Sequence, residues 1–446
     1  MRIVPLCLAS ASLATAVLVT SAAEAQSATK PPPNEDLLGE FVVTGVQQEK
    51  LPKIAILPSL SPDLEDVVVR SVVRRDFELT GMYEVIDDAK APAGLYGFDD
   101  PVDIDAWRKL GPESIVKVAA RKHSSGKIQV FGLAYFLSVG KDPVYEKTLL
   151  VDKELVRVTA HRITDALLGA LTGRPGGFAS RFTFAAKWGR HHRVFTMDAD
   201  GHDLTPVSDP KATSIAPAWG SGERLFYLRS DDYAPFKLFR YESQKHIALD
   251  LPFKTSVYSV AFNHDYTKLA IAVAENGGSS IYVGDPDGKN LTRVSKTPLS
   301  THPVFSPSGK LAWIGGNPTK DGSQRVYVDG KAVSPPGFVA AAPVFCDTED
   351  GIRLVYAVGV GNDNQDLVMS AENGQGIARL TQNQGSNAYP ACSPDGRMLA
   401  FFSTRQGKKG LYMMSLKRWR TQKVISQYGE SLRWAPLPPP AASATP

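Results

Sequence analysis

The side chains that could carry out chemistry are few, and they do not converge on a familiar catalytic motif. The segment Asp198-Ala199-Asp200-Gly201-His202-Asp203 has the carboxylate density of a calcium loop but lacks the distal glutamate of the twelve-residue form. His191 and His192 are adjacent, so their rings cannot share a helix face as the ligands of a His-Glu-x-x-His zinc site do. We expect a hairpin turn at 198–203, with adventitious calcium binding as the alternative, and a surface loop at the two histidines.

Hydrolase and zinc motifs are also missing from the sequence. It contains no Gly-x-Ser-x-Gly nucleophile elbow, no His-Glu-x-x-His and no Cys-x-x-Cys. Of the three cysteines, Cys7 lies in the N-terminal apolar segment, and the two others are too few for a structural zinc site of familiar spacing. We therefore expect no catalytic residues, no metal and no cofactor.

Length and composition bound the scaffold that carries these residues. The 446 residues correspond to two or three domains, at a typical ~150 residues per domain. Hydrophobic residues make up 43% and charged residues 22%, with 37 Gly and 32 Pro, which is typical of a turn-rich globular protein. The net charge of +4 is too dilute to bind a phosphate backbone, so nucleic acid is not an expected partner.

The first 25 residues have the pattern of a secretory signal peptide. Arg2 provides the charged start, residues 3–23 are apolar and small, and Ala23-Glu24-Ala25 is a small-x-small cleavage motif. We expect cleavage after Ala25 and export of the mature chain, with an N-terminal anchor helix as the alternative. Beyond this segment we expect no membrane span, because no other stretch has enough consecutive apolar residues.

A repeat of about 43 residues fills the second half of the chain. Each copy has an anchor strand, a turn that resembles Ser-Pro-Asp-Gly, a second apolar strand, and two further strands joined by a tight turn. Four strands in this length are typical of a β-propeller blade. The anchors are Trp219, Phe262, Phe305, Phe345, Cys392 and Trp434.

The two ends of the repeat region predict how the ring closes. Residues 181–207 supply three strands without an anchor, and the anchor at Trp434 has no strands after it. We expect these two parts to form one blade, which gives a six-bladed propeller over 177–436 and leaves no open sheet edge. A seven-bladed ring with a degenerate blade is the alternative.

The first half predicts a small α+β domain over 51–173. Segments 53–58, 82–86, 115–120, 128–137 and 145–151 read as strands, and helices are expected after Ser61-Pro62-Asp63, at 104–110 and at 155–171. The whole chain is therefore predicted to be mainly β. We expect residues 26–50 to form an N-terminal extended segment and 437–446 a disordered tail. Within the first of these, 40–45 reads as an edge strand of the α+β domain, with a detachable segment that pairs with a partner by strand addition as the alternative.

Cys346 and Cys392 are the cysteines that remain after cleavage of the signal peptide. Cys346 lies one residue past its anchor, whereas Cys392 occupies its anchor, so the two fall on different faces of the strand pattern. We expect two buried free thiols, with a disulfide as the alternative.

The order of these parts resembles the TolB family, the periplasmic component of the Tol–Pal system. The resemblance rests on the signal peptide, the strand-helix-strand opening at 54–86, the helix that ends in Leu171-Thr172-Gly173-Arg174-Pro175-Gly176-Gly177-Phe178, and the propeller. Its blades carry Pro-Val-Phe-Ser-Pro-Ser-Gly at 303–309 and Pro-Ala-Cys-Ser-Pro-Asp-Gly at 390–396. It covers nearly the whole mature chain.

The resemblance implies a monomeric, non-enzymatic scaffold that supports outer-membrane integrity and constriction during cell division. Such proteins bind the lipoprotein Pal at the propeller mouth and TolA through their N-terminal segment. On this basis the TolA segment spans 36–48 and includes Glu40, Phe41, Val42, Val43 and Thr44. The residues expected to face Pal, just ahead of the anchor strands, are Ser256, Ser259, Thr301, His302 and Tyr389.

This chain also departs from the family pattern. Ser-Pro-Asp-Gly is intact only at 393–396, Val260 replaces the usual proline, and Cys392 replaces an anchor aromatic. The alternative function is a periplasmic propeller enzyme, or a small-ligand binder, that uses the central channel.

Overall fold

The computed structural model describes residues 50–59, 63–317 and 323–437, and all of them lie in one compact unit, Pro33–Pro446. The predicted signal peptide, most of the N-terminal segment and most of the predicted tail lie outside the described residues. Across the described ranges, no helix combines the length and apolar character needed to cross a membrane.

An α+β region comes first in the chain, as predicted. Its five-stranded sheet has the order β2-β1-β3-β4-β5, in which β1 is parallel to β2 and β3, and the remaining neighbours are antiparallel. The strands are β1 (Lys53–Ile56), β2 (Glu84–Val85), β3 (Ser114–Lys122), β4 (Ile128–Phe136) and β5 (Tyr145–Val151). The expected strand at 82–86 is thus only two residues long.

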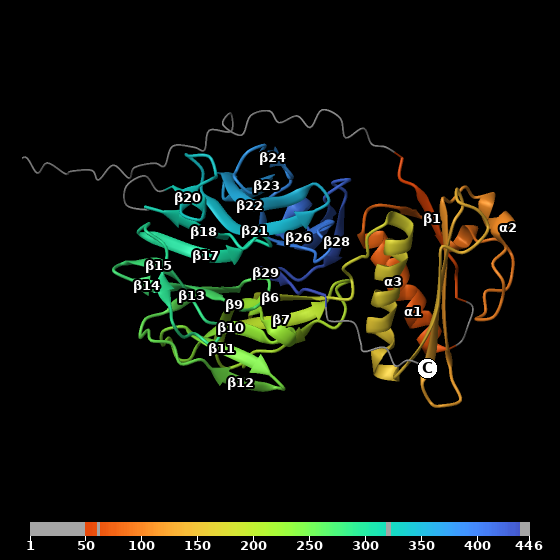
Figure 1. The fold of residues 1–446 in the computed structure, drawn as a ribbon, viewed down its shortest axis with the longest axis horizontal. Helices are drawn as coiled ribbons and strands as arrows, with labels where there is room; N and C mark the ends of the chain where they lie inside the picture. Colours follow the sequence, from red (N-terminus) through yellow and green to blue (C-terminus); the bar gives the residue numbers. More distant parts are fainter. Residues whose placement is uncertain (1–49, 60–62, 318–322, 438–446) are drawn as a thin grey trace, which may run out of the picture. The chain divides into compact units, whose positions relative to one another are not determined.

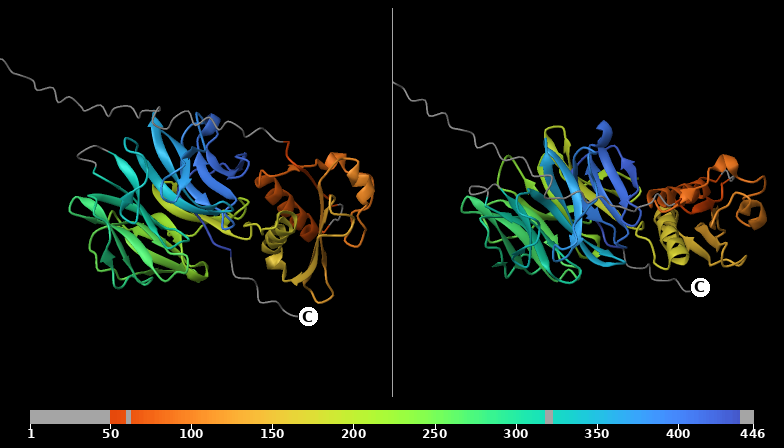
Figure 2. Two further views of the ribbon diagram at one scale, coloured as in Figure 1. Left: turned by 45° about the horizontal axis from the view of Figure 1, so that its top comes forward. Right: turned by 90° about the horizontal axis from the view of Figure 1, so that it is seen from above.

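Strand alternation explains how the helices cover this sheet. Ile54 and Ile56 point to the face covered by α1 (Leu64–Leu79) and α3 (Val156–Thr172), whereas Ala55 and Leu57 face Trp107 of α2 (Ile104–Arg108). Figure 1 and Figure 2 show α1 and α3 on the same side of the sheet. Helix α3 ends at Thr172 and is capped by Gly173, whose φ of 81° is the left-handed conformation that glycine adopts without strain.

The rest of the described chain forms a six-bladed β-propeller, which confirms the blade count (Figure 1). Each blade is a four-stranded antiparallel sheet, and its innermost strand lies beside the innermost strands of its neighbours around the ring. The first three blades are β29 (Glu430–Trp434), β6 (Arg181–Trp188), β7 (His191–Asp198) and β8 (Thr205–Pro206); β9 (Thr213–Trp219), β10 (Leu225–Ser230), β11 (Lys237–Glu242) and β12 (Lys245–Ala248); and β13 (Val257–Phe262), β14 (Leu269–Glu275), β15 (Gly278–Gly284) and β16 (Thr292–Arg293).

The last three blades follow the same order of strands. They are β17 (Leu299–Phe305), β18 (Leu311–Gly316), β19 (Gln324–Val328) and β20 (Lys331–Ala332); β21 (Ala340–Thr348), β22 (Gly351–Gly361), β23 (Asn364–Ala371) and β24 (Ala378–Arg379); and β25 (Asn387–Cys392), β26 (Met398–Ser403), β27 (Gly410–Ser415) and β28 (Thr421–Ile425).

The first blade closes the ring in the predicted way. Strand β29 pairs antiparallel with β6, with Trp434 opposite Phe182. The two rings lie 4.3 Å apart at their centroids, and the Trp434 indole N–H donates to the Ser180 hydroxyl at 2.7 Å. The C-terminal strand is therefore attached by backbone pairing, ring packing and a buried hydrogen bond.

Asp165 of α3 ties this helix to the chain that leads into the propeller. Its two carboxylate oxygens accept the backbone N–H groups of Phe178 and Ala179 at 2.7 and 2.8 Å. Burial raises the pKa of Asp165 to about 7, while the two N–H donors act in the opposite direction. The apolar core of the α+β region is continuous with that of the first and sixth blades.

The expectation of two free thiols is wrong, because Cys346 and Cys392 form a disulfide with 5.4 Å between their Cα atoms. The two do occupy opposite faces of their strands, as the register predicts. However, in the fifth blade one face of the innermost strand points toward the sixth blade. In the sixth blade it is the opposite face of the innermost strand that points back toward the fifth. Opposite phase in neighbouring blades therefore brings these side chains together.

The surface loop expected at His191 and His192 is also wrong, because both residues begin strand β7. They pair with Trp188 and Lys187 across a hairpin whose turn is Gly189-Arg190. Gly189 adopts the left-handed conformation that such a short turn needs, so the two strands pair right up to the turn and include both histidines. By contrast, the hairpin turn expected at 198–203 is confirmed, since the Asp198 N–H donates to the His202 carbonyl at 2.9 Å.

Candidate functional site: the mouth face of the propeller

One end of the propeller gathers the loops that lead into the innermost strands, and we call it the mouth face. Each innermost strand runs away from this face and the second strand returns to it, so the hairpin between the second and third strands also lies there. The opposite end holds the turns that follow the innermost strands. In the fifth and sixth blades those turns contact the segment that leads out of α3: Arg174 donates to the Asp347 carbonyl at 3.2 Å, and Gly177 lies against Pro394.

Every innermost strand carries a β-bulge near the mouth face. In five of the six blades the first bulged residue has a left-handed φ between 46° and 54°, and in four of those a proline follows it. Because proline has no N–H to give to the ladder, a bulge is where a strand tolerates it. The left-handed residues are Ala216, His302, Ala342, Tyr389 and Ser431.

The structure brings two of the residues predicted to face Pal together in neighbouring blades. The Ser259 hydroxyl of the third blade accepts the backbone N–H of His302 in the fourth at 3.0 Å. His302 Nδ1 lies 3.0 Å from the Thr301 hydroxyl. Ser256 lies at the start of the third blade, where its hydroxyl accepts the N–H of Phe236 at 3.1 Å. Ser259 is buried, whereas the others, with Tyr389 of the sixth blade, are half-buried.

Burial controls the charge of the groups near the propeller axis. It lowers the pKa of His302 to about 4, and the Arg433 cation, on the blade opposite, acts in the same direction. Burial also lowers the pKa of Arg433 to about 10 and raises that of Tyr389 to about 12. At neutral pH this region therefore presents a neutral imidazole and a neutral phenol beside one guanidinium.

Three aromatic side chains on the mouth face are exposed, and the repeat pattern does not predict them. Trp188 ends the second strand of the first blade and is 56% exposed. Tyr233 lies in the 231–236 loop of the second blade and is fully exposed, and Tyr258 at the bulge of the third blade is 44% exposed. Exposed aromatic rings are enriched at protein interfaces. The repeat pattern could not reveal them, because they lie outside its apolar positions.

One buried cluster elsewhere has the residue types of a metal site. Candidate ligand atoms of Asp76, His161 and Asp200 all lie within 4.8 Å of one another. However, His161 Nδ1 is 2.8 Å from Asp76 Oδ2, and Arg157 pairs with Asp200 and, at 2.9 Å, with Asp198. The cluster is thus an ion-pair network that joins the α+β region to the 198–203 turn.

The segment predicted to bind TolA lies outside the described residues. Glu40, Phe41, Val42, Val43 and Thr44 all precede Lys50, where the description of the chain begins. Their role therefore remains a prediction.

Comparison with known proteins links this geometry to a family. Residues 40–133 match the family model of the TolB amino-terminal domain. A relative from Polaromonas naphthalenivorans, named Tol-Pal system protein TolB, is 28% identical over 196 residues, 43% of this chain and 44% of the relative. The resemblance to TolB is confirmed. The protein of the same name from Albidiferax ferrireducens is 26% identical with the same coverage, so the chain spans under half the length of these two TolB relatives.

The fold agrees with a TolB structure over a larger part of the chain. The crystal structure of TolB from Acinetobacter baumannii has a TM-score of 0.73 and covers 87% of this chain and 97% of that one, at 18% identity. This match supports the six-bladed propeller with an α/β region ahead of it.

Proposed function

We propose that the chain is a non-enzymatic periplasmic scaffold of the Tol–Pal system. In this proposal the mouth face binds the lipoprotein Pal, and residues 36–48, including Glu40 to Thr44, bind TolA. The scaffold would thereby support outer-membrane integrity and constriction during cell division. The TolB amino-terminal match and the names of the relatives support the system, and the signal-peptide pattern of residues 1–25 supports the compartment.

The observation that carries the Pal assignment is the chemistry of the mouth face. It combines exposed aromatic rings at Trp188, Tyr233 and Tyr258 with neutral polar groups nearer the axis, such as His302 and Tyr389. Nearer the axis lies the half-buried arginine Arg433, and aromatic rings together with arginine are the side chains most enriched at protein interfaces.

The alternative function, an enzyme or small-ligand binder at the axis, would have to use His302. Its ring lies near the Thr301 hydroxyl, as a general base lies near a nucleophile. In the described part of the chain, however, no carboxylate lies within hydrogen-bond distance of this ring to orient it. A pKa of about 4 also leaves the imidazole a weak base at neutral pH.

The test of the Pal assignment is calorimetric titration of residues 26–446 with the soluble domain of Pal from the same genome. The variant Thr301→Ala with His302→Ala should weaken saturable binding. The matched control is His264→Ala with Thr267→Ala, a histidine and a threonine at the opposite end of the third blade. Equal effects of the two double variants, or no binding at all, would contradict the assignment.

A second titration tests the TolA assignment separately. The periplasmic domain of TolA should bind residues 26–446 but not residues 49–446, which lack the predicted segment. Both chains should still bind Pal, because the shorter one retains the whole mouth face. Binding of TolA to the shorter chain with unchanged affinity would contradict the assignment.

A further inference from the structure

Arg433 is a charged residue at a position where the propeller repeat has small or apolar side chains. It directly precedes the anchor Trp434 on the innermost strand β29. The residues that precede the other five anchors are Ala218, Ala261, Val304, Val344 and Ala391. Four of these five pack into apolar clusters between blades. Because alanine is sufficient for packing here, the fold itself does not require a guanidinium at this position.

The Arg433 guanidinium can be reached from solvent. Its Nη1 donates to the Leu432 carbonyl at 3.0 Å, but Nε and Nη2 donate to no acceptor among the described residues. Unlike the three guanidinium nitrogens of Arg397, which are buried without a partner, these two nitrogens remain accessible. The Nε–H and Nη2–H bonds are parallel, so this free edge matches the two oxygens of a carboxylate. A group that enters the central channel can therefore pair with Arg433 through two hydrogen bonds.

The free edge of Arg433 lies a short way inside the propeller mouth. Arg433 follows the bulge at Ser431 by two residues, which is about 7 Å along the strand. Its cation lowers the pKa of His302 on the opposite blade, so the guanidinium lies toward the propeller axis. A side chain of a partner bound at the mouth face needs to extend only this far to meet it.

No acidic side chain balances this charge in the part of the chain that the structure describes. Burial lowers the pKa of Arg433 to about 10, and no carboxylate raises it. Arg229 on the second blade shows the usual arrangement, since it pairs with Asp209 and Asp231 at 3.1 and 2.7 Å. An unpaired charge in a half-buried position is costly, and a carboxylate from a partner would offset that cost.

The mouth-face loops beside Arg433 are basic. Arg190 in the hairpin of the first blade, and Lys408 and Lys409 in that of the sixth, are all exposed. Over the described ranges none of the three forms an ion pair, and Glu430, an acidic residue on this side, lies 3.9 Å from His192 Nε2. Cations around an interface attract an acidic partner and orient it as it approaches.

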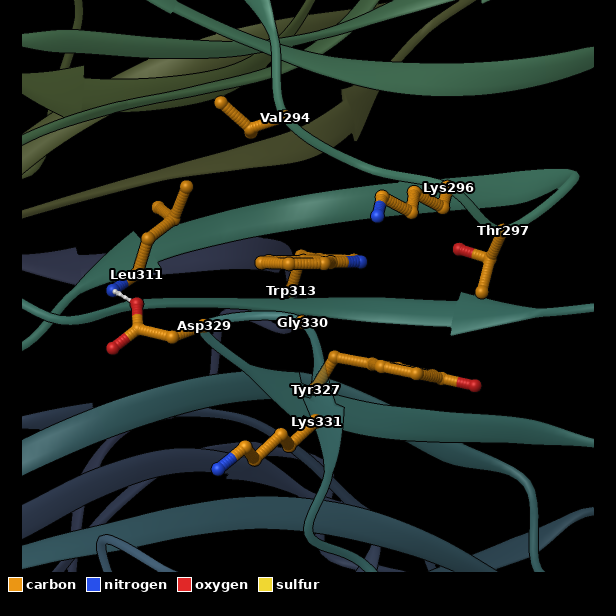
Figure 3. Close-up of a pocket in the computed structure, with 9 residues that line it drawn as sticks. All are labelled: Val294, Lys296, Thr297, Leu311, Trp313, Tyr327, Asp329, Gly330 and Lys331. Atoms are coloured by element: carbon orange, nitrogen blue, oxygen red, sulfur yellow. Dashed lines mark hydrogen bonds between the residues drawn. The ribbon is translucent and has the colours of Figure 1, made fainter.

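A cavity of about 480 Å³ between the third and fourth blades does not offer a comparable anion site. Its two lysines, Lys296 and Lys331, lie on opposite sides of the Trp313 and Tyr327 rings (Figure 3). The two ammonium groups therefore do not share one anion. Trp313 is 3% exposed, so its indole ring is not available to a ligand.

We propose that Arg433 binds a carboxylate of Pal that enters the propeller mouth, while an acidic surface of Pal covers the basic loops of the first and sixth blades. This inference rests on the proposed binding of Pal at the mouth face and assigns a specificity-determining residue to it. His302 and Tyr389 near the guanidinium are neutral, so the carboxylate pairs with one cation, and the half-buried position strengthens that pair.

Calorimetric titration of residues 26–446 with the soluble domain of Pal tests this pair. Arg433→Ala should fold, because alanine precedes the anchor in the second, third and sixth blades, and should bind Pal at least about thirtyfold more weakly. Arg433→Lys keeps the charge but loses the parallel N–H pair, so its affinity should lie between those of the parent and Arg433→Ala.

The matched control is an arginine of similar burial at the other end of the propeller. Arg353 of the fifth blade is half-buried and donates to the Asp350 carbonyl at 3.3 Å. Arg353→Ala should bind Pal as the parent does. An equal loss of affinity in this variant would show that the effect of Arg433→Ala is not specific to the channel.

A double-mutant cycle identifies the group on Pal that pairs with Arg433. Each acidic residue of the Pal domain is changed to its amide, and one change should weaken binding to the parent about thirtyfold but cause no further loss with Arg433→Ala. Lys408→Gln with Lys409→Gln should instead slow association and reduce its dependence on salt. Lys237→Gln with Lys254→Gln, exposed lysines at the mouth-face loops of the second and third blades, should change association less.

The outcomes separate this inference from the proposal that it extends. If Arg433→Ala binds Pal as well as the parent does, while Thr301→Ala with His302→Ala binds it more weakly, the mouth assignment holds and the carboxylate pair is wrong. If Arg433→Ala weakens binding but no acidic residue of Pal couples to it, the pair is also wrong. Failure of the parent to bind Pal would contradict the mouth assignment and, with it, this inference.

Discussion

Cys346 and Cys392 join the innermost strands of the fifth and sixth blades, with 5.4 Å between their Cα atoms. Each lies beside a turn that contacts the segment leading out of α3. Arg174 donates to the carbonyl of Asp347, next to Cys346, and Gly177 lies against Pro394, two residues after Cys392. The disulfide therefore holds together two turns against which this segment packs.

Reduction of this disulfide should lower stability measurably. It closes a loop with a sequence separation of 46, and loops of this size are stabilised by roughly 2–4 kcal/mol, chiefly through the unfolded chain. We expect the urea midpoint of residues 26–446 to fall when a reductant is added. The variant Cys346→Ser with Cys392→Ser should show the lower midpoint at once and no further response to reductant.

A thiol assay is the control for this prediction. Under native, non-reducing conditions residues 26–446 should contain no titratable thiol, because the third cysteine, Cys7, lies in the predicted signal peptide. Two reactive thiols in the oxidised protein, or an unchanged midpoint after reduction, would show that the disulfide does not form.

The sequence was sufficient for the blade count, the ring closure and most helices and strands. These features follow from the regular spacing of the anchor strands, which recur from Trp219 to Trp434. The pairing of Cys346 with Cys392 does not follow from the repeat. The repeat shows that the two side chains lie on opposite strand faces, but not which face of each strand points toward the neighbouring blade. The bulges could have been foreseen, since prolines such as Pro303 and Pro390 lie within strands.

The candidate site was less accessible from sequence than the fold. Thr301 and His302 lie at the mouth face, where the order of strands and loops in a blade puts them, and their contact with Pal stays a prediction. Tyr233 and Tyr258 were not found, because the exposure of a loop residue has no periodic signal. The position before each anchor could have revealed Arg433, because the other five blades have Ala or Val there.

The stability of the protein should fall as pH rises from about 6.5 to 9. Burial alone would lower the pKa of His161, but the Asp76 carboxylate and Asp200 outweigh this and raise it to about 9. A histidine whose pKa is raised on folding stabilises the folded state fully below its unfolded pKa of 6.5, and this contribution is lost through pH 9. The loss is at most roughly 3 kcal/mol.

Thermal unfolding between pH 6.5 and 9.5 checks this dependence. The variant His161→Gln should be less stable at pH 6.5 and should show a flatter pH profile than the parent. His202→Gln is the matched control, because His202 is exposed on the neighbouring turn, and it should keep the slope. A slope that His161→Gln leaves unchanged would assign the pH dependence to other groups.

Truncation of Trp434 should destabilise the propeller more than truncation of an exposed tryptophan. Trp434 is 9% exposed, packs on Phe182 and donates to Ser180, so Trp434→Ala leaves a cavity and an unpaired hydroxyl. We expect a loss of about 3–5 kcal/mol, seen as a lower urea midpoint. Trp188→Ala in the same blade, at 56% exposure, is the control. Similar midpoints for the two variants would mean that closure does not depend on this ring.

The exposed aromatic residues of the mouth face should carry much of the affinity for Pal. Tyr233→Ala and Tyr258→Ala each remove a ring that projects from the rim without filling the core, so folding should be unaffected. Interface hot spots cost more than about 1 kcal/mol on truncation, and we expect each variant to weaken Pal about tenfold in calorimetric titration. Leu95→Ala removes an apolar side chain of the α+β region that is 77% exposed, and it should leave Pal binding unchanged. If Leu95→Ala weakened binding while the tyrosine variants did not, Pal would bind the α+β region and not the propeller mouth.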